Sequence, residues 1–395
     1  MGREYLRARA RIACGTVVAA VTTLGLGAAP AMAGKPGGGG GGTSGTPTTY
    51  SGSAYNLKAT VNPLNVLPTK IGPVTYSALP ADGSGGIAQD SLLDLNGIVT
   101  TPLLVSADAL STSAVGSGSL SSSFSSVADV ALGVPGALGI PGLTMSVSVI
   151  QTEADAVCTN GVASTSGSSE ILSLTVNGTK YGLSGSLPPN ITIPGVVSIN
   201  LNEQVVTGSG GSKSISVNAI HITTLSPLAT LVPADIILGH SDAGITCASG
   251  SNPPPPPCGV QDFVTGGGHV GGWAFGFVGG LKPNGLSGHF NAKNVSGNGD
   301  HLQGTPVTGY GVGPDPTYSR VINYAAKLNG VSLANGLTLT VADYGEPGTN
   351  DKAGWTAGSD NVSYQVISEG NIQLHPVHGC DSLESTSTGG GGHHK

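Results

Sequence analysis

Apolar and polar residues alternate with a period of two along much of the chain, which is the pattern of half-buried β-strands. Residues 197–202 alternate in this way, and residues 215–219 do so again after the turn-rich segment 207–212. Two alternating runs joined by glycine and serine predict a long hairpin. The alternation at residues 143–149 predicts a further strand.

A second hairpin signal lies at Asn177-Gly178, between the apolar runs 171–176 and 180–183. Asn-Gly favours the two-residue turns whose twist matches that of paired strands. The segment 103–132 is rich in serine and alanine, and its composition leaves room for a short helix.

The last third of the chain follows the same period. Trp273, Phe275 and Phe277 alternate with alanine and glycine, and residues 337–341 and 372–374 alternate as well. Short strands separated by turn signals predict a sandwich or a barrel.

Low-complexity segments divide the chain. The six glycines 37–42 predict a flexible spacer, and the five prolines 253–257 predict a stiff polyproline II rod. We therefore expect an all-β protein with two β-sandwich-like domains joined by a polyproline linker. The expected organisation is a signal peptide (1–33), a Gly-rich linker (34–49), a first β domain (50–249), a Pro linker (250–257), a second β domain (258–380) and a disordered Gly/His tail (381–395).

Composition narrows the class further. The 395 residues include 65 Gly and 26 Pro, and only 9% are charged. Glycine at this density disfavours helices, because each Gly costs about 1 kcal/mol relative to Ala in a helix interior. So little charge argues against a coiled coil or a charge-driven disordered chain.

The N-terminus reads as an export signal for the general secretory route. Four arginines within residues 3–11 precede the uncharged stretch 12–27, and the small-residue site 31–33 follows. Without residues 1–33, 11 of the 15 basic and 21 of the 22 acidic residues remain, a net charge of −10. Such a chain lacks the basic footprint that nucleic acid requires, and no later run is long enough to span a membrane.

Export favours oxidised cysteines. Four follow the signal, Cys158, Cys247, Cys258 and Cys380, and they allow three pairings. The proline run separates them into Cys158–Cys247 and Cys258–Cys380, which is the pairing we expect. A zinc site is the alternative, but no C-x-x-C spacing supports it.

Two motifs resemble catalytic or cofactor sites. Residues 266–271 fit G-x-G-x-x-G, but an apolar strand pattern follows where a dinucleotide site needs a helix, so we expect a glycine turn. Residues 239–244 resemble a nucleophile elbow with one residue too many, and we expect a turn there too. A serine hydrolase using Ser241 and His240 is the remote alternative. His221 continues the every-second-residue series of Ile215, Val217 and Ala219, which predicts that it lies on the apolar face of the strand.

The best cation candidate is the turn 343–351. It holds three carboxylates, Asp343, Glu346 and Asp351, and calcium takes carboxylate and carbonyl oxygens from such loops. A solvated turn is the competing interpretation. Three histidines on different predicted strands, His289, His301 and His375, form a metal site only if the fold brings them together.

The chain resembles the choice-of-anchor P proteins, which are exported bacterial proteins common in actinobacteria. In the first region the matching segments are 71–73, 168–171, 202–204, 217–221 and 239–247. In the second region the matching segments are 264–268, 287–290, 300–301, 343–351 and 370–375. This second region resembles a post-anchor-family β domain. The resemblance implies an extracellular or cell-surface β protein without an established activity, and it transfers no catalytic residue.

The sequence therefore favours a secreted or cell-surface structural or adhesive interaction protein without catalysis. Its expected partners are the cell envelope, a glycan or an extracellular protein surface. The alternative is a glycan- or calcium-binding module, based on Trp273, Trp355 and the carboxylate turn.

Overall fold

The computed structural model of the chain describes residues 48–376, apart from 63–67, 96–97, 101–102, 135, 137–138, 182–187, 249–261, 283–284 and 346–347. These residues form an all-β fold, as the alternation predicts, and in this part of the chain the helix α1 (Leu228–Leu231) is the exception. The predicted signal peptide, Pro linker and tail lie outside the described residues, as does the predicted Gly-rich linker up to residue 47; its last residue, Thr49, begins β1. The described residues of Gly45–Lys395 belong to one compact unit.

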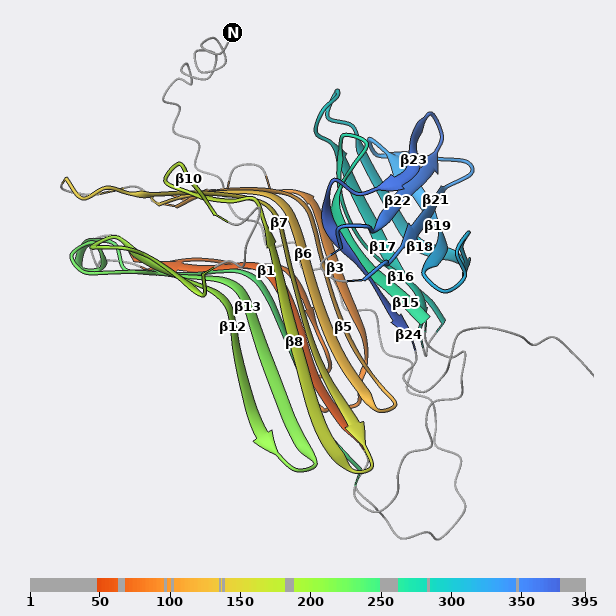
Figure 1. Cartoon of the computed structure of the whole chain (residues 1–395), viewed down its shortest axis with the longest axis horizontal. Coiled ribbons are helices and arrows are strands. Elements are labelled where there is room, and N and C mark those ends of the chain that lie inside the picture. Colours follow the sequence, from red (N-terminus) through yellow and green to blue (C-terminus); the bar gives the residue numbers. More distant parts are fainter. Residues whose placement is uncertain are drawn as a thin grey trace, which may run out of the picture. The chain divides into compact units, whose positions relative to one another are not determined.

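The first region forms two antiparallel sheets (Figure 1). The first sheet has the order β11-β12-β13-β14-β1-β2, and the second has β10-β9-β7-β6-β5-β3, with β4 beside β5 and β8 beside β7. Their bounds are β1 (Thr49–Val61), β2 (Thr69–Ala78), β3 (Gly86–Asp94), β4 (Ile98–Thr100), β5 (Leu103–Ser117), β6 (Leu120–Val134), β7 (Leu143–Thr159), β8 (Val162–Leu172), β9 (Leu174–Val176), β10 (Thr179–Tyr181), β11 (Asn190–Ile193), β12 (Val197–Ser209), β13 (Ser212–Thr224) and β14 (Ala234–Thr246).

Local turn signals are confirmed in this region. The segment 207–212 ends β12 and begins β13 as predicted, and Asn177-Gly178 joins β9 to β10 with positive φ at both residues. The helix that we considered within residues 103–132 is wrong, because the segment forms the β5–β6 hairpin. Its serines and alanines are buried on both faces of β5 and β6, where small side chains fit between closely packed layers.

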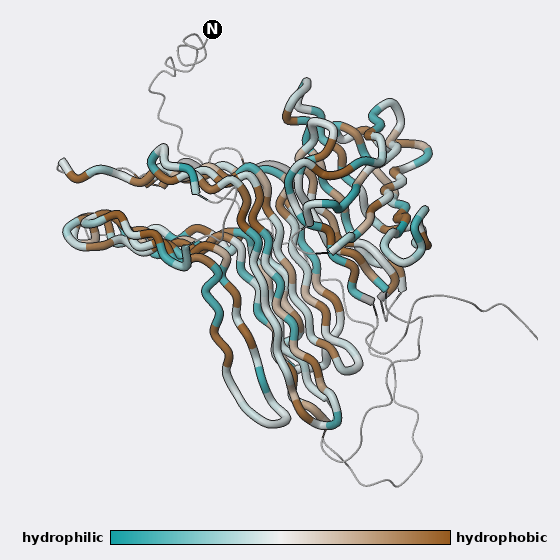
Figure 2. The backbone as a smooth tube through the Cα atoms, in the orientation of Figure 1, coloured by the Kyte–Doolittle hydropathy of each residue, from teal (hydrophilic) through white to brown (hydrophobic). Residues whose placement is uncertain are grey.

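The two sheets pack face to face over a shared apolar core. Leu57 and Leu238 of the first sheet lie in one cluster with Leu110, Ile150 and Leu174 of the second. Apolar and polar segments alternate along these strands (Figure 2). The first region is therefore a β-sandwich.

Strands of both sheets change direction partway along their length (Figure 1). In the first sheet, one row of residues on neighbouring strands is unpaired in the ladders, while the register on either side stays the same. The row consists of Asn202, Ala219, Gly239, Asn56 and Thr75. Three of them, Asn202, Gly239 and Thr75, have positive φ. In the second sheet a similar row runs through Ser173, Ser148 and Asp129. We call these two rows the bend rows.

Beyond the bend rows the sandwich interior is mixed. A smaller apolar cluster that includes Ile215, Val217 and Ile245 surrounds the two cysteines. Next to it, buried serine and threonine hydroxyls bond within a sheet and between the sheets. Thr152 Oγ1 of β7 lies 2.8 Å from Ser125 Oγ of β6 and 2.7 Å from Ser241 Oγ of β14. Ser77 of β2 lies 2.8 Å from Thr112 of β5 in the same way. These bonds satisfy hydroxyls that have lost access to water.

The second region is one antiparallel sheet with the path β23-β22-β21-β19-β18-β17-β16-β15-β24 and with β20 beside β19. Its bounds are β15 (Asp262–Val270), β16 (Trp273–Lys282), β17 (Gly285–Asn294), β18 (His301–Val312), β19 (Ser319–Leu328), β20 (Val331–Ser332), β21 (Leu337–Ala342), β22 (Lys352–Ala357), β23 (Asp360–Val366) and β24 (Glu369–Pro376). The second region is all-β as expected, but it is not the second β-sandwich that the sequence led us to expect, because its strands pair into one sheet, the third sheet, which curls into a half-barrel (Figure 1).

The concave side of the third sheet holds an aromatic core. Phe290 lies 5.2 Å from Trp355, and Trp273 meets Trp355 edge to face at 5.8 Å, both between ring centroids. A buried ion pair lies at the edge of this core, where Arg320 Nε donates to Asp262 at 2.8 Å and Tyr310 donates to the same carboxylate at 2.7 Å. Burial and the negative charge of Asp262 raise the pKa of Tyr310 well above its usual value.

Candidate functional site

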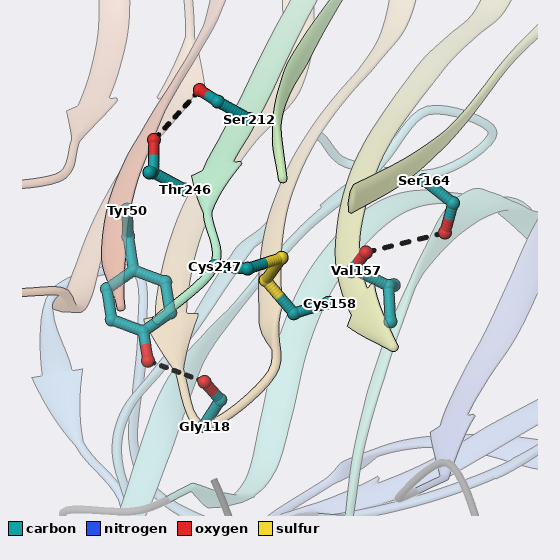
Figure 3. Close-up of a disulfide and its surroundings, with 8 residues drawn as sticks. All are labelled: Tyr50, Gly118, Val157, Cys158, Ser164, Ser212, Thr246 and Cys247. Carbon is teal, nitrogen blue, oxygen red and sulfur yellow. Dashed lines mark hydrogen bonds between the residues drawn. A yellow bond between two sulfur atoms is a disulfide. The ribbon is translucent and has the colours of Figure 1, made fainter. Parts of the chain in front are cut away.

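One predicted disulfide is present in the first region. Cys158 at the end of β7 bonds to Cys247, just after β14, with the two Cα atoms 5.7 Å apart (Figure 3). The bridge therefore links one layer of the sandwich to the other at the end distant from the bend rows. Cys258 and Cys380 lie outside the described residues, and their pairing stays a prediction.

Ser241 and His240 do not form a catalytic pair. The turn predicted at 239–244 is wrong, because β14 runs through it as a continuous strand. Successive residues of a strand point to opposite faces. Ser241 is fully buried between the layers and bonds to Thr152, whereas His240 stacks on Tyr55 and lies 2.6 Å from Asn218.

The glycines that imitate a dinucleotide motif serve close packing. Residues 266–268 lie inside β15 rather than in the predicted turn, which falls at Gly271-Gly272 instead, and a strand follows. A Cβ at Gly267 would lie 2.6 Å from Ser126 Oγ, and one at Gly276 would lie 3.1 Å from the Ala109 carbonyl oxygen. Glycine thus lets the convex face of the third sheet approach the second sheet closely.

His221 does not lie on the apolar face. The bend row at Ala219 reverses the alternation, so that Ala219 and Ile220 are both buried and His221 turns outward. Its ring nitrogens lie 2.8 Å from Glu203 and 3.0 Å from Asp235. Burial raises the pKa of Glu203, but hydrogen bonds from Asn218 and His221 outweigh this and lower it overall.

In the predicted calcium turn, two carboxylates accept backbone hydrogen bonds. Asp351 accepts from the N–H groups of Tyr344 and Ile372, at 2.8 and 2.7 Å. Asp343 accepts from Gly345 and Leu374, at 2.8 and 2.9 Å. These bonds attach β24 to the turn. Glu346 lies outside the described residues, and the calcium site stays a prediction.

The three histidines have separate surroundings. His289 is buried on β17 and His301 begins β18. His375 of β24 stacks on Phe263, with its Nδ1 3.2 Å from Glu153 and its Nε2 2.8 Å from Thr265. Within the described residues, no group of three or more His, Cys, Asp or Glu side chains is placed to hold a metal ion.

Charged pairs connect the third sheet to the second, and sequence reasoning missed them. His269 of β15 lies 3.0 Å from Asp129 of β6 and 3.5 Å from Glu369 of β24. Lys293 of β17 lies 2.8 Å from Asp108 of β5. Burial lowers the pKa of His269, but the two carboxylates outweigh this effect and raise the pKa overall.

Trp273 and Trp355, on which the glycan-binding alternative was based, are buried in the core of the third sheet. A partly exposed aromatic cluster occurs elsewhere on that sheet. It consists of Tyr318, Tyr344, Tyr364 and Val366 with Lys352 and Asp315, and we call it the tyrosine patch.

The geometry of the tyrosine patch follows from backbone pairing. Asp343 N–H donates to the Tyr318 carbonyl at 2.9 Å, which places the Tyr318 and Tyr344 rings 5.3 Å apart. Lys352 Nζ lies 5.3 Å from the centre of the Tyr344 ring and 5.8 Å from that of Tyr364. Cation–π contacts of this kind hold the two rings in place.

The tyrosine patch exposes apolar surface together with hydrogen-bonding groups. Tyr318 is 46% exposed, Tyr364 36% and Val366 48%. Burial, then the neighbouring Tyr344 and Asp315, raise the pKa of Tyr364 to about 12, so its phenol stays neutral and able to donate near neutral pH. The three tyrosines come from separate strands and loops, so no local sequence signal could have grouped them.

No protein-family model and no curated protein matches the chain. Among solved structures, a putative AttH from Nitrosomonas europaea has 7% sequence identity and a TM-score of 0.21, with 83% of this chain and 93% of that one covered. No helix in the described part of the chain is long and apolar enough to cross a membrane.

Proposed function

We propose that the chain is a secreted or cell-surface structural or adhesive protein that binds an extracellular protein through the tyrosine patch. The observation that supports the proposal is the partly exposed set Tyr318, Tyr364 and Val366 around Lys352. Tyrosine is enriched at protein interfaces, because its ring buries apolar area while its hydroxyl keeps a hydrogen bond.

The sheet beneath the tyrosine patch suits a docking role. Tyr344 is fixed by Lys352 and by its own hydroxyl, 3.4 Å from Asp315, so binding orders few additional groups. Binding to a preorganised surface costs less free energy, because fewer side chains lose conformational freedom. The proposal assigns no catalytic role, since Ser241 is engaged between the layers.

The test measures binding of the labelled protein to the surface of the cells that produce it. Wild type should bind saturably, and the double variant Tyr318→Ala/Tyr364→Ala should bind at least tenfold more weakly, as expected for two aromatic anchors. Tyr76→Ala is the matched control, because Tyr76 is 50% exposed and lies outside the tyrosine patch on β2.

Protease treatment of the cells before binding separates the partner classes. The proposal expects binding to disappear with the surface proteins. Binding that survives protease, or equal binding by wild type and the double variant, would contradict it.

A further inference from the structure

A polar cleft of about 500 Å³ lies where the edge strand β3 meets the convex face of the third sheet. Its walls come from β3 on one side and from β17, β18, β19 and β20 on the other. The volume falls within the range of small-molecule sites. The cleft is separate from the tyrosine patch and does not depend on the proposed function.

Hydrogen-bond donors form a row across the floor of the cleft. Asn291 of β17 pairs directly with Gln303 of β18, and Gln303 pairs directly with Lys327 of β19. Residues directly opposite in antiparallel strands point to the same face, so these three side chains are neighbours. His289 lies on that face too, two residues before Asn291.

Asn291 carries the strongest sign of a ligand. The residue is only 3% exposed, and its side-chain Nδ2 has no hydrogen-bond partner among the described residues. A buried amide donor without a partner is costly, and a ligand oxygen would satisfy it. Across the cleft, Gln89 Nε2 is also buried without a hydrogen-bond partner among the described residues. The Gln89 Oε1 atom accepts a hydrogen bond from Ser287 at 3.3 Å.

The charges of the cleft indicate the kind of ligand. Lys327 supplies a cation beside the amide donors. On β3, the Asp90 carboxylate already accepts from the backbone N–H groups of Tyr76 and Ser91, each at 2.8 Å. Asp90 keeps its negative charge on the β3 wall, whereas Lys327 and the amide donors Asn291 and Gln303 lie on the wall formed by the third sheet. The third-sheet wall therefore suits a ligand carboxylate, and the β3 wall suits ligand hydroxyls that donate to Asp90.

We propose that this cleft binds an acidic sugar of the hexuronic acid class. The carboxylate lies against Lys327, and ring hydroxyls accept from Asn291, Gln303 and Gln89.

The test is titration of the purified full-length chain with glucuronate and, separately, with glucose, followed by calorimetry and by NMR. Glucuronate should bind saturably and more tightly than glucose. Asn291→Asp, which replaces the donor by an anionic acceptor, and Lys327→Ala should each weaken glucuronate binding at least tenfold. Lys70→Ala is the control, because Lys70 is exposed on β2 outside the cleft.

Thermal melting of each variant separates lost binding from lost folding, and Asn291→Ser replaces Asn291→Asp if the latter melts early. Absence of saturable glucuronate binding up to about 50 mM would overturn the proposal, because binding weaker than this is too weak for a specific site. Glucose binding as tight as glucuronate binding, or variants that bind like wild type, would overturn it equally.

Discussion

At the scale of single residues, glycine and serine decide how closely the layers approach. Gly267 and Gly276 lie where the third sheet meets the second, and Ser126 lies opposite Gly267. The glycines that dominate the composition are therefore a packing device as well as turn formers. The sequence pattern around Gly267 predicts a turn, because the strands of the second sheet against which this glycine packs are distant along the chain.

Gly267→Val should destabilise the protein by about 1–3 kcal/mol, the usual cost of overpacking. The added side chain would meet Ser126 and the Phe275 carbonyl, and backbone cannot move aside cheaply. Thermal melting measures the effect. Gly311→Val is the control, since a Cβ there meets no atom within 4 Å, and an equal loss in both variants would contradict the packing role.

At the scale of strands and sheets, two hairpin turns could be predicted from local residues, whereas the turns expected at 239–244 and 266–268 and the phase of the alternation could not. The turns at 177–178 and 207–212 follow from their own residues. The outward position of His221 does not, because it depends on a bend that neighbouring strands share at Ala219 and Gly239, where the ladder lacks one pair and the register is unchanged. The tyrosine patch could not be predicted either, because its residues come from segments that are distant along the chain.

Contact between the second and third sheets should weaken with rising pH through His269. Its pKa is raised in the folded protein, so its stabilising charge is complete below the unfolded value of about 6.5 and is lost as pH rises through the higher folded value. The relevant charges facing it are Asp129 and Glu369. His269→Gln cannot titrate.

Unfolding of wild type and His269→Gln, compared from about pH 6 to pH 9, measures this contribution. The advantage of wild type should shrink across that interval. A difference that stays constant with pH would show that the ring acts by packing alone.

At the scale of the whole molecule, two cores of different chemistry share one compact unit. The sandwich has its large aliphatic cluster on one side of the bend rows and buried hydroxyls with a smaller apolar cluster on the other, while the third sheet encloses an aromatic core. Composition and alternation were enough to predict the all-β class. They could not predict that the second region is a single curled sheet, since strand order is set by long-range pairing.

Loss of the Cys158–Cys247 bridge should cost about 4–5 kcal/mol, the chain-entropy estimate for a sequence separation of 89 residues. Cys158→Ser, Cys247→Ser and the double variant should therefore melt at the same lowered temperature. A double variant that melts well below either single variant would show that the two cysteines act separately.

The bend rows also restrict how the length of this chain can change in evolution. Because side chains alternate with period two, deleting one residue between a bend row and the next hairpin turn would carry every intervening side chain to the opposite face. Deleting two would keep the faces, and deleting the bend-row residue itself, such as Gly239, would remove the phase change. Insertions and deletions in the long strands β12 and β14 should thus be tolerated in pairs.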